Sequence, residues 1–139
     1  MSDNRLFRGI PHPLKPALYL QLLYTGLVVV WQLVGLVLLS MGQLALGPTA
    51  SLSVAVQALA IAAFCIWALR GSFPLLFVLA CVGPATAGGA TIVRAFTAAP
   101  ELWPSDEIRY LGVAVNVVGV MTLPTALVQY FRWKSSHES

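Results

Sequence analysis

The sequence predicts an all-α integral membrane protein, in which four transmembrane helices form one antiparallel up-down bundle over residues 1–139. Apolar residues make up 58% of the chain and charged residues 9%, against roughly 25% charged residues in soluble domains. Four apolar runs, at about 16–41, 49–69, 73–96 and 110–131, are each long enough to cross a hydrocarbon layer of about 30 Å as a helix. They lack the strict alternation of barrel strands, so helices are expected.

The first run is expected to be a retained span and not a secretory signal. Its apolar stretch is longer than the roughly 7 to 15 residues of a signal peptide, and no small-x-small cleavage site closes it. The segment before it, RLFRGIPHPLKP, places Leu6, Phe7 and Ile10 among basic residues, and its prolines forbid a long helix. We expect this segment to lie extended on an anionic leaflet.

The third run contains CVGPATAGGATIVR, in which a proline and three glycines interrupt an apolar helix. Pro84 lacks a backbone N–H and its ring clashes with the carbonyl of Ala80, so a bend near mid-membrane is predicted. This bend is either an accommodated kink in a packed bundle or a hinge that opens for a ligand.

The fourth run has a recognisable helix start. Ser105 can cap a helix whose first turn holds Asp106 and Glu107, where carboxylates favour the positive end of the helix dipole. The alternative role for this acidic pair is binding of a cation or ligand. Pro124 is expected to bend the helix, with neighbouring threonine hydroxyls satisfying the freed carbonyls.

Basic residues divide unequally between the two ends of the spans. One side would carry six of the eight basic residues, namely Arg5, Arg8, Lys15, Arg70, Arg132 and Lys134. The other side would carry Arg94 and Arg109. By the positive-inside rule both termini are cytoplasmic, in a plasma membrane of the bacterial inner-membrane kind.

Polar and small residues are expected to mark the interior, because helices in lipid associate through close backbone approach and interhelical hydrogen bonds. The predicted inward faces are Gln21, Thr25, Gln32 and Gly35 in the first run, Ser53, Gln57, Ala60 and Ala68 in the second, and Gly112, Asn116, Gly119 and Ala126 in the fourth. The amides on these faces either join helices to one another or line a pocket for a headgroup or small solute.

The third run carries a small-residue face that leads to an arginine: Ala80, Gly83, Ala87, Ala90 and Arg94. Close helix packing is the expected role of this face. Ala85 and Gly89 form a second small-xxx-small pair on another side. Arg94 is expected to pair with a carboxylate of the outer connection, the alternative being an anion-binding role.

These patterns define two groups of candidate residues. Candidates for ligand binding or a helix interface are Gln21, Gln32, Gln57, Gly83, Pro84, Gly88, Gly89, Arg94 and Asn116. Candidate contacts in the outer loop 100–109 are Glu101, Trp103, Asp106, Glu107 and Arg109. Cys65 and Cys81 have no metal-ligand spacing, so no metal site is expected.

The spans contain no Asp, Glu, Lys or His, and no phosphate loop or nucleophile elbow occurs. We therefore expect no enzyme activity, cofactor or nucleic-acid partner. The leading functional expectation is a non-catalytic accessory or assembly subunit that packs against itself, as a homo-oligomer, or against another membrane protein. One alternative is a small oligomeric transporter or channel for a neutral or anionic solute. The other is an outer-surface binder or inhibitor that acts through loop 100–109.

Overall fold

The computed structural model describes residues 9–46 and 50–138, and all regular elements in this part of the chain are helical. They are α1 (Lys15–Ser40), α2 (Leu52–Arg70), α3 (Pro74–Ala80), α4 (Val82–Thr97) and α5 (Asp106–Glu138), with short 3-10 turns at His12–Leu14 and Pro100–Leu102. Four helical segments are long and apolar enough to cross a membrane, with α3 and α4 together forming the third. The predicted all-α class is thus confirmed, and the four long apolar helices suggest a multi-pass membrane protein.

The span boundaries differ from the expected ones mainly in the fourth helix. α5 continues to Glu138, past the expected end near residue 131, because Arg132 and Lys134 sustain a helix after the apolar run ends. It also runs through Pro124 without interruption. The hydroxyl of Thr122 donates to the carbonyl of Gly119 at 2.7 Å, next to the Val120 carbonyl that Pro124 leaves without a donor.

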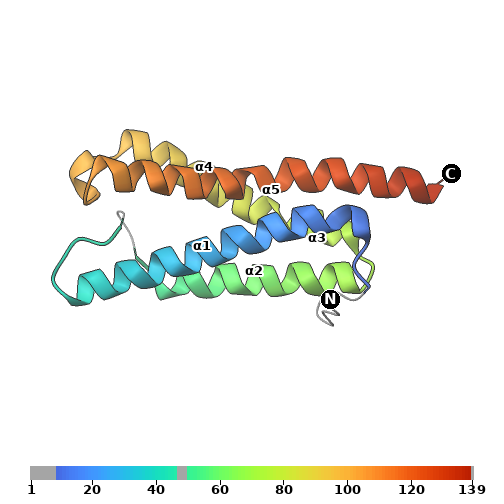
Figure 1. Cartoon of the computed structure of the whole chain (residues 1–139), viewed down its shortest axis with the longest axis horizontal. Helices are drawn as coiled ribbons and strands as arrows, with labels where there is room; N and C mark the ends of the chain where they lie inside the picture. Colours follow the sequence, from blue (N-terminus) through green and yellow to red (C-terminus); the bar gives the residue numbers. More distant parts are fainter. Residues whose placement is uncertain (1–8, 47–49, 139) are drawn as a thin grey trace.

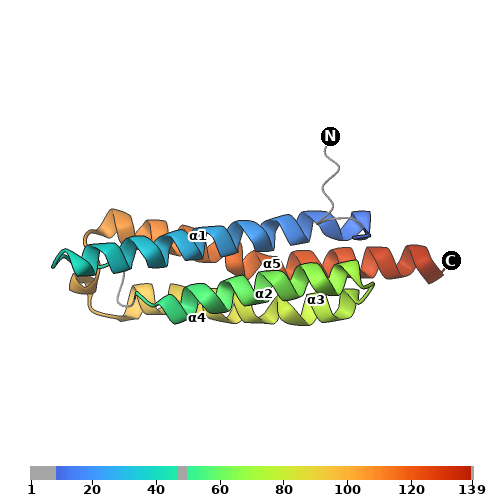
Figure 2. The same cartoon turned by 90° about the horizontal axis from the view of Figure 1, so that it is seen from below.

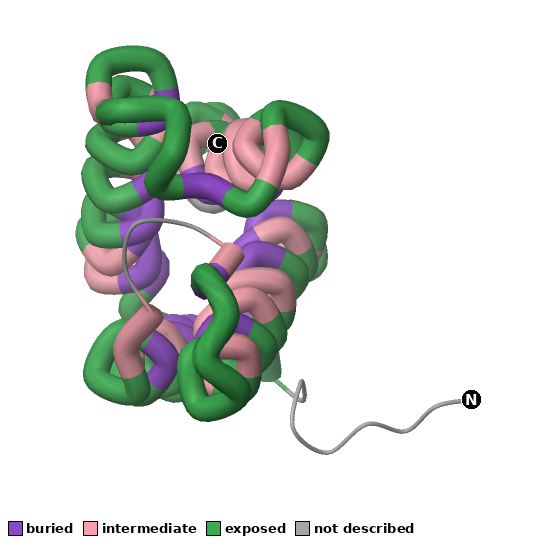
Figure 3. The backbone as a smooth tube through the Cα atoms, turned by 90° about the vertical axis from the view of Figure 1, so that its left-hand side faces the viewer, coloured by how far each residue is buried: buried purple, intermediate pink, exposed green. Residues whose placement is uncertain are grey.

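The helices form two hairpins, α1–α2 and α4–α5 (Figure 1). The start of α1, the α2–α3 connection and the C-terminal part of α5 lie at one end of the bundle, here called the Arg70 end (Figures 1 and 2). The α1–α2 and α4–α5 connections lie at the opposite end, here called the Trp103 end. Viewed along the bundle, buried positions face its axis (Figure 3).

A continuous apolar core occupies the Arg70 end. It is centred on Leu14, Leu18, Leu69 and Phe77, all without exposed surface. Ile10 is also buried in this core, so the expected placement of the N-terminal segment on the membrane surface is wrong at this residue. Leu6 and Phe7 lie outside the described residues.

The third span has a one-residue interruption at Cys81, three residues before Pro84. α3 ends at Ala80 and α4 begins at Val82, which places Pro84 in the first turn of α4, where a backbone N–H has no partner within the helix. The break allows the two halves to follow different neighbours. α3 packs against α2 and α5, whereas α4 makes its main helix contacts with α5.

Close packing of α4 and α1 on α5 occurs at glycines. A Cβ atom on Gly88 would lie 2.7 Å from the backbone oxygen of Asn116, and one on Gly119 would lie 2.6 Å from the ring of Tyr24. Both distances are shorter than the 3.0 Å that a Cβ atom needs, so a side chain at either position would force its neighbours to move. The glycines therefore permit the close backbone approach by which helices associate in lipid.

Two of the predicted inward faces need correction. In α4 the packed face contains Pro84, Gly88 and Ala95, while Gly83, Ala87, Ala90 and Arg94 of the predicted packing face are exposed. In α2 the buried residues are Ala55, Ala62, Cys65, Ala68 and Leu69, while Ser53, Gln57 and Ala60 are exposed. Small residues occur on several sides of both helices, so composition alone does not select the packed one.

Most of the helix surface faces outward. Only 22 to 28% of the most apolar 18-residue window of each span is buried inside the chain, and side chains such as Val30 and Phe131 are 60% exposed. In a bilayer this surface meets hydrocarbon, so its exposure carries no hydrophobic penalty.

Adjacent glycines in α4 offer a matched test of this packing. Gly88→Ala is expected to lower the free energy of unfolding by about 1 to 3 kcal/mol, because the new methyl group would press on the α5 backbone. Gly89→Ala should leave stability unchanged or raise it by up to about 1 kcal/mol, because nothing lies within 4 Å of its Cβ position. Reversible unfolding of the purified protein in detergent would measure both, and equal losses would contradict the packing.

Candidate functional site

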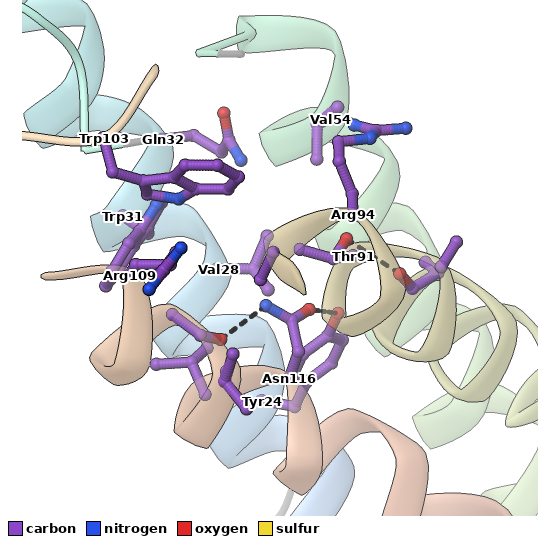
Figure 4. A pocket seen from close by; sticks show the side chains of 16 residues that line it. Tyr24, Val28, Trp31, Gln32, Val54, Thr91, Arg94, Trp103, Arg109 and Asn116 are labelled. Carbon is purple, nitrogen blue, oxygen red and sulfur yellow. Dashed lines mark hydrogen bonds between the residues drawn. The ribbon is translucent and has the colours of Figure 1, made fainter. Parts of the chain in front are cut away.

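A cavity of about 300 Å³ lies between the two hairpins toward the Trp103 end (Figure 4). This volume is at the lower limit of the range typical of ligand sites, roughly 300 to 1,000 Å³. Polar and aromatic groups on its walls include Tyr24, Gln32, Arg94, Trp103, Arg109 and Asn116. They come from α1, α4, α5 and the α4–α5 connection.

One wall of the cavity is held by an interhelical hydrogen bond. The hydroxyl of Tyr24 donates to Asn116 Oδ1 at 3.0 Å, and Asn116 Nδ2 donates to the carbonyl of Gly112 at 2.7 Å (Figure 4). A bond of this kind between membrane helices is worth about 0.6 to 2 kcal/mol. The amide of Asn116 therefore joins α1 to α5 while it faces the cavity.

Gln32 of α1 forms a hydrogen bond with the residue that caps the start of α2. Its Oε1 accepts from the backbone N–H of Ser51 at 2.8 Å, and the Ser51 hydroxyl accepts from the N–H of Val54 at 3.4 Å as the helix cap. Gln57 is exposed on α2, where its Nε2 donates to Ser53 Oγ at 3.1 Å. Gln32 thus has a structural partner in another element, whereas Gln57 is bonded only within its own helix.

A second, smaller cavity of about 90 Å³ adjoins the first and reaches toward the helix break. It is lined in part by Gln21, Gly83 and Pro84. The side chain of Gln21 is 1% exposed; its Nε2 donates to Thr25 Oγ1 at 3.1 Å, and its Oε1 has no hydrogen-bond partner among the described residues. An acceptor buried without a donor costs free energy.

Arg109 is partly neutralised within the first turn of α5. One of its terminal nitrogens lies 3.3 Å from Asp106 Oδ1 and 3.3 Å from the Tyr110 hydroxyl, and its guanidinium lies 5.1 Å from the Tyr110 ring centre. Its Nε is buried and has no hydrogen-bond partner among the described residues. Ser105 caps this helix as predicted, since its hydroxyl accepts from the N–H of Ile108 at 3.2 Å.

Arg94 does not form the ion pair expected of it. No carboxylate of the described chain lies within 4.0 Å of its guanidinium, and Asp106 pairs with Arg109 instead. Figure 4 shows the Arg94 side chain extending toward the start of α2, where Val54 lies, and therefore away from Trp103 and Arg109. The cavity wall consequently carries a positive charge without an acidic partner in the described chain.

The remaining candidates divide between packing and exposure. Gly88 is buried at the α4–α5 contact, Gly89 faces open space and Gly83 is exposed beside Ile61. Glu101 and Glu107 are exposed, whereas Trp103 is only 7% exposed because its ring turns into the bundle.

Two lining residues, Tyr24 and Trp31, were not among the sequence candidates. Tyr24 and Trp31 are seven residues apart in the first apolar run, so they lie on the same face of the helix. Such rings usually lie at the membrane interface, and their position inside an apolar run was the sequence signal that could have marked them as cavity residues.

The described residues include no group of three or more His, Cys, Asp or Glu side chains that could hold a metal ion. No family model, curated protein or solved structure matches this chain. The functional assignment therefore rests on the geometry of the cavity.

Proposed function

We propose that this chain is a small, non-catalytic membrane transporter that binds an anionic ligand in the cavity between its two hairpins. The observation that carries the proposal is Arg94, a guanidinium on the cavity wall with no carboxylate within 4.0 Å in the described chain. An unpaired charge in a membrane protein is costly and typically marks a ligand or ion pathway. Arg109 and the amide of Asn116 add hydrogen-bond donors and acceptors to the same wall.

The unequal packing of the two ends supports a transport role. The Arg70 end is filled by apolar side chains, while the cavity opens between the hairpins toward the Trp103 end. Many transporters work by rocking one helix bundle against another around such a one-sided site. The break at Cys81 is suitably placed for a hinge, because it separates α3, which packs against α2 and α5, from α4, which packs mainly against α5.

Loss of the unpaired charge should abolish anion binding. In wild-type protein, inorganic phosphate, benzoate or octyl phosphate should raise the midpoint of thermal unfolding, since a ligand at 100 times its Kd stabilises a protein by about 2.7 kcal/mol. Arg94→Ala should remove this shift and the corresponding anion flux in proteoliposomes.

Arg70→Ala is the matched control, because Arg70 is an exposed arginine at the opposite end of the bundle. It should retain both the thermal shift and the flux. Equal behaviour of the two variants, or no shift with any of the three anions, would contradict the proposed function.

We also propose that the protein lies in a plasma membrane of the bacterial inner-membrane kind, with both termini in the cytoplasm. The charge distribution supports this orientation. Lys15, Arg70, Arg132 and Lys134 belong to the Arg70 end, against Arg94 and Arg109 toward the Trp103 end. Arg5 and Arg8 lie outside the described residues.

Single introduced cysteines would test this orientation. Native Cys65 and Cys81 are fully buried and should react slowly. A membrane-impermeant maleimide is expected to label Glu101→Cys in intact cells and Ser135→Cys only after permeabilisation, since these exposed positions lie at opposite ends. The reverse pattern would contradict the orientation.

An accessory or assembly subunit is the second candidate, and the glycines on the outer surface favour it. Neither Gly26 nor Gly89 has an atom within 4 Å of its Cβ position, so the packing of the chain does not explain why these residues lack side chains. Small residues on a lipid-facing surface permit another helix to approach closely.

Native mass spectrometry of protein from its own membrane should then show a fixed ratio to a partner or to further copies. Gly26→Leu or Gly89→Leu should reduce this association, whereas Val128→Leu, on the exposed surface of α5, should not. A monomer in every case would contradict the accessory role.

A further inference from the structure

The side of the cavity between α2 and α4 is open. α4 packs mainly on α5, and Gly83, Ala87 and Ala90 on its α2 side are exposed. Val54 and Gln57 of α2, which line the two cavities, are exposed as well. Since both helices belong to candidate membrane spans, the opening faces the hydrocarbon of a bilayer and not bulk water.

The two cavities together form a space with a charged end and an apolar end. They share four lining residues, Tyr24, Val28, Val54 and Ala87. The larger cavity contains Arg94 and Arg109. Most of the smaller one is walled by aliphatic or small residues, including Ala58, Ile61, Gly83 and Pro84. This division matches a molecule with a polar headgroup and a hydrocarbon chain.

The charged end provides groups that favour an anion. Arg94 has no carboxylate within 4.0 Å in the described chain, and the buried Nε of Arg109 lacks an acceptor. Phosphate oxygens accept several charge-assisted hydrogen bonds from guanidinium groups. A phosphate headgroup would therefore pair with Arg94, which lines the same cavity as Arg109.

Access to this end from water is narrowed by an aromatic side chain. Trp103 comes from the α4–α5 connection, is 7% exposed and lies on the cavity wall together with Trp31 (Figure 4). At the opening toward α2, the side chain of Arg94 extends toward Val54, and the other α4 residues that border the two cavities are small, such as Gly83, Ala87 and Ala90. The geometry thus favours entry from the bilayer.

We propose that the ligand of this site is an anionic phospholipid of the surrounding bilayer. It enters sideways between α2 and α4, brings its phosphate to Arg94, and lays part of an acyl chain along Ile61 and Gly83. This inference rests on the proposed function, because it names the class of anion that the same cavity binds.

Titration calorimetry of the full chain in neutral detergent would test the inference with three probes. These are short-chain phosphatidylglycerol, phosphatidylcholine with the same chains, and inorganic phosphate. Phosphatidylglycerol is expected to bind about tenfold more tightly than either of the other two, because only it combines net negative charge with chains.

Two variants separate the headgroup from the chain. Arg94→Gln should weaken phosphatidylglycerol binding about tenfold by removing the charge. Gly83→Leu should weaken it about as much by filling the apolar end, where a Cβ atom would lie 3.4 Å from Ile61 Cδ1. Arg70→Gln is the control and should change nothing. If Gly83→Leu does not yield a folded, monodisperse protein, Ala90→Leu at the same opening replaces it.

The outcomes distinguish the lipid inference from the proposed function. Phosphate binding as tight as that of phosphatidylglycerol, lowered by Arg94→Gln and unaffected by Gly83→Leu, would overturn the lipid and leave an anion site. Equal binding of the two lipids with no effect of Arg94→Gln would overturn both, as would the absence of binding by all three probes. A protein helix found at the opening in place of lipid would also overturn the lipid inference.

Discussion

The interruption of the third span at Cys81 is the constraint on which the arrangement of the other helices depends. Pro84 cannot donate a backbone hydrogen bond to Ala80, so one straight helix from Pro74 to Thr97 would leave a carbonyl unsatisfied in an environment without water. The third span changes its neighbours at this interruption. α3 then remains with α2 while α4 leaves it for α5, and the space between the hairpins follows from that separation.

The two ends of the bundle are consequently stabilised in different ways. At the Arg70 end, Leu14, Leu18 and Phe77 pack with Cys81 in a core without exposed surface. Gln129 also joins the ends of two helices there, because its Oε1 accepts from the N–H of Ala17 in the first turn of α1 at 3.1 Å. At the Trp103 end, polar contacts such as Tyr24 with Asn116 hold the helices around a cavity. Lipid provides little hydrophobic drive for helix association, so these contacts and the close approaches at glycines carry much of the specificity.

The two arginines on the cavity wall differ in their ion pairing. The ion pair of Arg109 with Asp106 lies within one helix turn, and its side chains are 14% and 68% exposed. Arg94 has no carboxylate within 4.0 Å in the described chain. Arg94 is exposed in the last turn of α4 and lines the cavity that also contains Arg109, whose buried Nε has no hydrogen-bond partner among the described residues.

The sequence by itself determined the all-α class, four helices long and apolar enough to span a membrane, an irregularity near Pro84, the cap at Ser105 and the inward faces of the first and fourth helices. These features depend on local properties: the apolar length needed to cross a bilayer, the missing N–H of proline, and the capping geometry of serine. Only the tertiary structure decided which side of α2 and α4 is packed, that Asp106 pairs with Arg109 and not Arg94, and where the cavity lies. Lipid is as apolar as the helix interior, so hydropathy does not reveal how a membrane helix is rotated, and small residues lie on several sides of both helices. Their rotation is determined by the break at Cys81 and by the neighbour that each half of the third span contacts.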